Sequence, residues 1–507
     1  MKAFDRGALV RSALIVTRAT GITYLAGLII STVTARSLGP EDFGRYSYVV
    51  WLSGVVVICC TNGLTTTGIK FIAECLGRED ALSAARVYHL LRRYFLISVV
   101  VVLAGLLVAL PFVEPAGWRG SLLLLAVVVL LSGLPKGLYL LHSSVGKGYG
   151  NFSVEANTTN LSGVLGVMAT LVLAATGQPL EVYLLLFVLL GFCHAVLALW
   201  LIRRAGIRAS SGLVEPAMVG RLNVHLAWTM VLVLLAMVSN RTVETYLLNR
   251  TAGAEAVGYF IIAATLVRGG ADMLVSGLTA VLLPAMAHSY GQGGHERVNP
   301  ILANSVRYFS FFGLLLAGVG FLCSDLVVGL MYGPKYAAVG GVLKVMMLMA
   351  GLTLSEGAFN AVLITTDNQR LRVVLTTLAV AVAVGLAFAL VPRFGLAGAV
   401  AGHVASRVVM FATVVVITLR TTGMRLPWGL LGRQFAAAGV AAACAATMIA
   451  LVHGAWMGLA AAIVYALVLL VCSMAFKAWR EQDLAMLGTL AQRYPRIGMA
   501  LAWAGLR

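Results

Sequence analysis

The sequence predicts an all-α polytopic membrane protein with 14 transmembrane helices, arranged as two pseudo-symmetric six-helix lobes followed by two C-terminal helices. Three observations predict this fold class. Of the 507 residues, 60% are hydrophobic and only 11% are charged, with a mean hydropathy of +0.95, which is far from the composition of a soluble domain. Apolar runs of about 20 residues, long enough to cross a bilayer, recur along the chain. A short polar motif occurs twice.

The polar motif at residues 36–46 returns about 214 residues later, at residues 250–260. Four of its residues recur without a gap: Arg36, Gly39, Glu41 and Gly44 correspond to Arg250, Gly253, Glu255 and Gly258. Roughly 13 of about 60 aligned positions are identical, which indicates an internal duplication. Each copy joins two long apolar segments, so the motif predicts a structural turn between membrane helices.

The apolar segments define the predicted spans in order. We expect them near residues 13–35, 44–68, 94–113, 120–142, 157–176, 181–202, 222–249, 256–287, 308–331, 341–365, 371–392, 395–419, 432–453 and 456–476. Every connection between them is short, which excludes a large domain outside the membrane in this chain.

The repeat also predicts the domain organisation. Six helices per copy is an even number, so both copies cross the membrane in the same direction and are related by an axis along the membrane normal. We therefore expect a first lobe at 1–212, a second lobe at 213–425, two further spans at 426–478 and an amphipathic cytoplasmic tail at 479–507. With the N-terminus inside, about 25 of the 37 Lys and Arg residues fall in cytoplasmic segments, so both termini are expected to face the cytoplasm.

Charged residues inside the predicted spans are candidates for function, because burying them in hydrocarbon is costly. The basic candidates are Arg18, Arg241, Arg268 and Arg407, and the acidic candidates are Asp272, Glu356 and Glu244. Arg268 and Asp272 lie four residues apart on one helix face, so they form either a local ion pair or part of a site. Glu356 with Asn360, and His403 with Arg407, also share faces, and either pair could serve hydrogen bonding between helices.

Neutral polar residues in the spans offer hydrogen bonds that suit sugar hydroxyl groups. The candidates are Asn62, Thr65, Asn157, Asn160, Asn240 and Asn360. Small polar side chains also help helices pack closely, so this pattern alone is weakly specific. Lys136 is a further basic residue within a span, and His194 is expected to be structural.

The sequence lacks the motifs that mark several other classes of function. The chain contains no Walker loop, no HExxH and no GxSxG motif, so an enzyme is not expected. The seven cysteines mostly lie in apolar runs without paired spacing, so neither a metal site nor disulfides are expected, and no cofactor is implied. The net charge of +18 is spread over short loops, which fits membrane topology and not nucleic-acid binding.

The segment Leu38-Gly-Pro-Glu-Asp-Phe-Gly44, followed by Gly63-Leu64 and Phe71-Ile-Ala-Glu74, resembles the polysaccharide transporter family. These proteins are O-antigen-type flippases of the multidrug/oligosaccharidyl-lipid/polysaccharide exporter superfamily. The resemblance implies transfer of an undecaprenyl-diphosphate-linked oligosaccharide across the bacterial inner membrane, for O-antigen of lipopolysaccharide, capsule or exopolysaccharide. It further implies contact with membrane lipid, and with a polymerase and other polysaccharide-assembly proteins, but it does not identify the glycan.

This resemblance leads to a mechanistic expectation of alternating access by rocking of the two lobes. Arg18, Arg241, Arg268 and Arg407 would bind the diphosphate, because guanidinium groups match phosphate oxygens in a bidentate fork. Asp272, Glu356 or Glu244 would sense a coupling ion. Three alternatives stay open: a peptidoglycan lipid-precursor flippase, a drug/cation antiporter, and a membrane polysaccharide polymerase or ligase. Basic residues outnumber acidic ones within the predicted spans, which disfavours an antiporter of cations, because its cavity should be acidic. The absence of a large periplasmic loop disfavours the polymerase or ligase.

Overall fold

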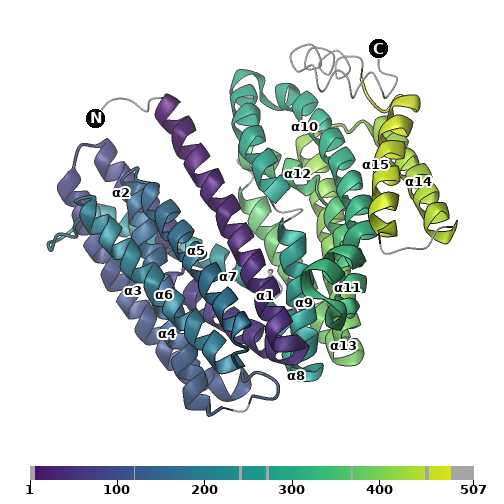
Figure 1. Cartoon of the computed structure of the whole chain (residues 1–507). Helices are drawn as coiled ribbons and strands as arrows, with labels where there is room; N and C mark the ends of the chain where they lie inside the picture. The colour runs from purple at the N-terminus through teal and green to yellow at the C-terminus, as the bar shows by residue number, and fades with distance from the viewer. Residues whose placement is uncertain are drawn as a thin grey trace. The chain divides into compact units, whose positions relative to one another are not determined.

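The computed structural model describes residues 6–118, 120–238, 242–269, 273–366, 369–451 and 456–480, with side chains described from residue 21 onward except for parts of 270–293 and 364–372. These residues are almost entirely α-helical and include no strand (Figure 1). The α-helices are α1 (Arg6–Thr61), α2 (Leu64–Gly77), α3 (Ala81–Ala109), α4 (Leu122–Gly148), α5 (Ser153–Ala175), α6 (Leu180–Arg204), α7 (Pro216–Met237), α8 (Val243–Thr251), α9 (Gly253–Val267), α10 (Met273–Tyr332), α11 (Ala337–Leu352), α12 (Glu356–Thr365), α13 (Gln369–Thr422), α14 (Trp428–Leu451) and α15 (Met457–Ala475). The predicted all-α fold class is confirmed.

Eleven helical segments among the described residues are long and apolar enough to cross a membrane. Two of them, Gly21–Gly77 and Val373–Thr422, each contain two of the predicted spans. Glycines at positive φ explain how one continuous segment holds two spans, because Gly39 (φ 77°) joins two helices within α1 and Gly395 (φ 54°) does so within α13. The described residues of the fourteen predicted spans therefore fall almost entirely on helical structure.

The chain forms two contact units, residues 1–262 with 380–399, and residues 263–379 with 400 onward. The first unit has one apolar core, which includes the fully buried Val49, Leu91 and Leu125. The second unit has one core around α10, α12 and α13 and another where α10 packs with α14 and α15. There, the Tyr465 hydroxyl of α15 donates a hydrogen bond to the Leu314 carbonyl of α10 at 2.9 Å. The lobe boundaries drawn from the repeat stay a prediction.

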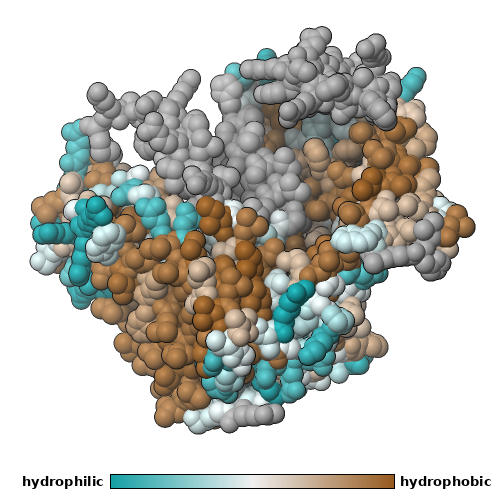
Figure 2. Space-filling view, viewed as in Figure 1, coloured by the Kyte–Doolittle hydropathy of each residue, from teal (hydrophilic) through white to brown (hydrophobic). Residues whose placement is uncertain are grey.

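The outer flank of the first unit is apolar. Large hydrophobic side chains on α3 and α4 are exposed, among them Val100 (65%), Val108 (75%) and Leu123 (71%). Figure 2 shows these helices and α6 covered by hydrophobic side chains, with hydrophilic ones toward the helix ends. In water such a surface would be strongly unfavourable, so this flank is suited to lipid.

The two copies of the polar motif adopt the same local structure. Gly39 (φ 77°) and Gly253 (φ 88°) are both in the left-handed region, where glycine carries no steric penalty. In each copy the motif's glutamate then pairs with the residue four positions later, Glu41 with Arg45 and Glu255 with the Tyr259 hydroxyl. Arg36 and Arg250 are exposed. The motif therefore forms the turn that the sequence predicts.

The last glycines of the two copies pack against each other. A Cβ atom on Gly44 would overlap the Ala254 carbonyl, and one on Gly258 would lie 3.2 Å from the Cα of Gly44 and 3.3 Å from the Pro40 carbonyl oxygen. Residues that correspond in the two copies thus meet directly. This contact is expected close to an axis that relates the copies, and only glycine allows such a close backbone approach.

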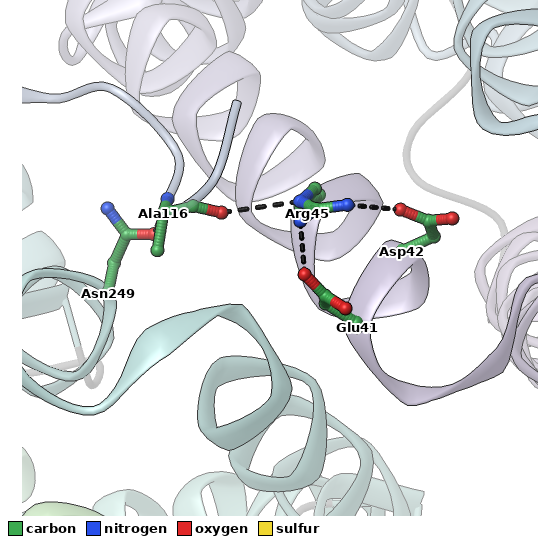
Figure 3. A network of polar contacts seen from close by, with 5 residues as sticks. All are labelled: Glu41, Asp42, Arg45, Ala116 and Asn249. Atoms are coloured by element: carbon green, nitrogen blue, oxygen red, sulfur yellow. Dashed lines mark hydrogen bonds and ion pairs between the residues drawn. The ribbon is translucent and has the colours of Figure 1, made fainter. Parts of the chain in front are cut away.

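A buried arginine ties the first motif to the segment between α3 and α4 (Figure 3). The Arg45 side chain is only 8% exposed, pairs with Glu41, and places Nη1 2.6 Å from Asp42 Oδ1. Its Nε donates to the Ala116 carbonyl at 3.3 Å. Asn249 holds the same segment through two hydrogen bonds of 2.7 Å, in which the Ala116 N–H donates to Asn249 Oδ1 and Asn249 Nδ2 donates to the Glu114 carbonyl. Residues 114–116 are therefore clamped between Arg45 of the first motif copy and Asn249, which directly precedes the second copy.

Candidate functional site

Two of the predicted spans are interrupted among the described residues, and a polar candidate lies at each interruption. The first interruption separates α1 from α2 beside Asn62, and the second separates α11 from α12 beside Glu356. A break in a membrane helix leaves backbone N–H and C=O groups unpaired, which is tolerated only where protein or a water-filled cavity satisfies them. In transporters, interrupted helices often carry the substrate site. Each of these two interruptions is therefore a candidate functional site within its own contact unit.

The interruption between α1 and α2 lies at Asn62 and Gly63, which have φ angles of 27° and 83°. Asn62 lines a pocket of about 380 Å³ together with Tyr94, Ser98 and Asn223. The Tyr94 hydroxyl donates to Asn223 Oδ1 at 2.9 Å, whereas Asn62 Oδ1 has no hydrogen-bond partner among the described residues. The rest of the lining is formed by Leu64, Ile97, Leu226, Ala227 and Met230. The pocket thus presents a few neutral polar groups on a largely apolar wall.

The other candidates for sugar contacts lie apart from this pocket. Thr65 is half-buried in α2, and Asn157 is exposed near the start of α5. Asn160 is half-buried in α5, and its Oδ1 is buried without a hydrogen-bond partner among the described residues. None of the three lines the pocket beside Asn62. Asn240 lies outside the described residues.

The structure brings together three candidates at the start of α12. Arg407 of α13 places Nη1 3.7 Å from Glu356 Oε2, and the Asn360 amide donates to Glu356 Oε1 at 3.5 Å. The Arg407 side chain is 41% exposed and that of Glu356 is 15% exposed. A single long pair of this kind contributes little stability, so the Arg407 guanidinium keeps donors for an anionic ligand.

The remaining charged candidates are placed only in part. Arg268 is exposed directly after α9, and Glu244 is buried (3% exposed) in α8. Arg18 lies in α1, where its side chain is not described. Arg241 and Asp272 fall outside the described residues, so the gathering of the four arginines and the pairing of Arg268 with Asp272 stay predictions.

Sequence reasoning did not find the pair formed by Lys136 of α4 and His194 of α6. Lys136 Nζ lies 3.1 Å from His194 Nε2, and His194 Nδ1 lies 2.7 Å from the Leu190 carbonyl oxygen. The carbonyl accepts the Nδ1 proton, so Nε2 accepts from the lysine. Lys136 also lies 5.4 Å from the centre of the Tyr139 ring. The sequence offered one signal for this pair. Lys136 and His194 each lie in an apolar run, and a polar residue there needs a polar partner from a nearby span.

Residues 9–290 match the model of a family described as polysaccharide biosynthesis protein. No curated protein gave a significant match. Solved structures of similar fold share less than 20% sequence identity with this chain, so the similarity shows the fold alone.

Three solved structures illustrate this similarity. The lipid II flippase MurJ in an inward closed conformation has a TM-score of 0.72, with 12% identity over 92% of this chain and 98% of that chain. An inward-facing multidrug resistance transporter of the MATE family and MOP superfamily has a TM-score of 0.65, with 16% identity over 79% and 94%. A MOP-superfamily transporter from Pyrococcus furiosus has a TM-score of 0.58, with 17% identity over 82% and 95%.

Proposed function

Because the chain belongs to the family of polysaccharide biosynthesis proteins, we propose that it is a flippase for an undecaprenyl-diphosphate-linked oligosaccharide in the bacterial inner membrane. The family match over residues 9–290 is the observation that carries this proposal. The apolar flank and the many spanning helices make the chain a multi-pass membrane protein. The product would be a surface polysaccharide such as O-antigen, capsule or exopolysaccharide.

The chemistry of the substrate explains why polar groups are needed inside the spans. A diphosphate with several sugars cannot cross hydrocarbon, whereas its polyprenyl chain can remain in lipid. Arg18, Arg241, Arg268 and Arg407 would bind the diphosphate, and the exposure of Arg268 and Arg407 supports that role. The neutral pocket beside Asn62 would contact sugar hydroxyls. Alternating rocking of two lobes would then expose the head group first to one side and then to the other.

Arg268→Ala and Arg241→Ala are each expected to reduce surface polysaccharide export about tenfold or more, because a charge-assisted hydrogen bond contributes about 1.5–3 kcal/mol. Export is measured by surface glycan staining in a flippase-deletion strain of the host, with membrane levels of each variant quantified by immunoblot. Arg420→Ala is the control, since Arg420 is exposed at the end of α13 and should export normally. Normal export by both test variants would refute the cationic site.

Glu356 is the described carboxylate best placed for coupling, because it contacts both Arg407 and Asn360. Glu356→Gln preserves size and hydrogen bonding but removes the charge. We expect this variant to keep its thermal stability while flipping in vesicles loses its response to an imposed proton or sodium gradient. If wild-type flipping ignores both gradients, coupling through Glu356, Asp272 or Glu244 is excluded.

A second candidate function is flipping of a peptidoglycan lipid precursor, favoured by the similarity to the lipid II flippase MurJ over 92% of the chain. Complementation separates the two. Rescue of a strain depleted of its lipid II flippase would support the peptidoglycan substrate. Rescue only of a polysaccharide flippase mutant would support the oligosaccharide.

A further inference from the structure

A second pocket lies on the other side of α7, where this helix packs against α2. It has a volume of about 580 Å³ and is lined by Lys70 and Phe71 of α2 and by Arg221, Val224 and Trp228 of α7, among others. Lys70 and Arg221 are about 10 Å or less from the ends of their helices at Gly77 and Pro216. Their depth matches the boundary between hydrocarbon and head groups, on the side predicted to face the cytoplasm.

The pocket carries excess positive charge. Glu74 is the acid beside it and is shared by two arginines, with Nη2 of Arg78 at 2.5 Å and the two terminal nitrogens of Arg221 at 2.9 and 3.1 Å. Lys70 is exposed and forms no ion pair within 4 Å among the described residues, although the charge of Glu74 acts on it at longer range. Lys70, Arg221 and the neighbouring Arg78 carry three positive charges against the one negative charge of Glu74, so a net charge of +2 remains around the pocket. Of the three, Lys70 and Arg221 line the pocket and are exposed to an anion.

The buried Phe71 ring fixes these basic groups around one position. Lys70 Nζ lies 5.4 Å from the ring centre, the Arg221 guanidinium lies 5.8 Å from it, and the His225 ring lies 5.8 Å away in an edge contact. Phe71 is only 1% exposed, so it is a rigid support. Cations held over an aromatic ring are partly ordered, which lowers the entropic cost of binding a ligand.

The other wall of the pocket is apolar and exposed. Val224 is 62% exposed and Trp228 is 63% exposed, one and two turns further into the membrane along α7 than Arg221. Free inorganic phosphate would leave this wall uncovered, whereas a lipid would cover it with its chain. Tryptophan is also enriched at the membrane interface, and basic pockets between membrane helices bind anionic head groups.

We propose that this α2–α7 pocket binds the phosphate group of a membrane lipid, with Lys70 and Arg221 contacting the phosphate and Val224 and Trp228 contacting the hydrocarbon chain. Two lipids share this chemistry, a polyprenyl diphosphate and an anionic phospholipid. The proposal does not depend on which substrate the protein flips, because it concerns binding in one leaflet.

The test measures binding of phosphatidylglycerol, undecaprenyl diphosphate and neutral diacylglycerol to the purified full-length protein by native mass spectrometry. Lys70→Gln is the main variant, since Lys70 takes part in no ion pair among the described residues. We expect at least one phosphate lipid to bind about tenfold more weakly to Lys70→Gln, which corresponds to about 1.4 kcal/mol. Lys70→Arg should restore binding, and diacylglycerol should not distinguish the variants.

Arg204→Ala is the matched control, because Arg204 lies 5.2 Å from the Trp200 ring at the end of α6 but lines neither described pocket. A loss confined to undecaprenyl diphosphate supports a docking site for the substrate, and a loss confined to phosphatidylglycerol supports a resident phospholipid. Unchanged binding of both lipids to Lys70→Gln would overturn the proposal, as would an equal loss in Arg204→Ala. Since binding is measured without transport, failure here is separate from failure of the proposed flippase function.

Discussion

Gly44→Ala is expected to lower the free energy of unfolding by about 1–3 kcal/mol, the usual cost of forcing extra volume into a packed interior, and to impair export with it. The added Cβ would overlap the Ala254 carbonyl, which belongs to backbone and cannot rotate away. The two motif copies would therefore have to separate. Thermal unfolding of the purified protein in detergent measures the change.

Gly54→Ala is the control for this substitution. Gly54 lies in the same helix α1, and a Cβ there would meet no heavy atom within 4 Å. Alanine favours a helix over glycine by roughly 1 kcal/mol, so this variant should be as stable as the wild type or slightly more stable. Equal behaviour of the two variants would show that the contact between the motif copies does not hold the structure together.

Linking α2 to α7 with a short bifunctional thiol reagent should stop export completely. The anchor points are Cys75 and Met218→Cys, since the two native side chains meet with Cys75 Sγ 3.8 Å from Met218 Sδ. A cysteine at 218 places its sulfur one bond nearer its own backbone, so a short linker bridges the pair, and the other native cysteines are replaced by serine. The repeat assigns α7 to the second predicted lobe, yet its first turns bind α2 and α3 through the Arg221–Glu74 and Tyr94–Asn223 contacts. If the lobes rock against each other, these contacts must break in every cycle.

A matched control joins two helices of the same predicted lobe. Ser162 Oγ of α5 and Cys193 Sγ of α6 are also 3.8 Å apart, so Ser162→Cys with Cys193 accepts the same reagent. Export should continue in that variant, and a reducible reagent should restore export in the α2–α7 variant after reduction. Continued export with α2 and α7 linked would mean that α7 moves together with the first lobe. That result would agree with the contact units, since α7 belongs to the first of them.

The fourteen spans and the motif turn were predictable because both depend on local sequence. Apolar length marks a span, and a glycine two residues before a glutamate recurs in both copies at the same left-handed φ. The interruption at Asn62 and Gly63 was not predicted, although the sequence carries a local signal for it. Asn-Gly is a dipeptide typical of turns, whereas the spans were assigned from hydropathy, which does not report backbone angles.

Contacts between residues far apart in the chain could not be predicted from the sequence for a different reason. Lys136 and His194 each look like an isolated polar residue, and only the packing of α4 on α6 makes them partners. Arg45 has acids three and four residues before it, a spacing that indicates helical ion pairs, but nothing local indicates its bond to Ala116. The proposed cationic site remains a prediction, since Arg241 and Asp272 lie outside the described residues.

The clamp on residues 114–116 has a consequence for how the protein is made. Arg45 is available early in synthesis, but Asn249 emerges from the ribosome only after the whole first repeat and the next span have been translated. A nascent chain that ends before Asn249 therefore holds this segment from one side only. Completion of the clamp thus reports that the first span of the second repeat has been inserted beside the first repeat. A protease that cleaves this segment would distinguish chains that end before Asn249 from longer ones.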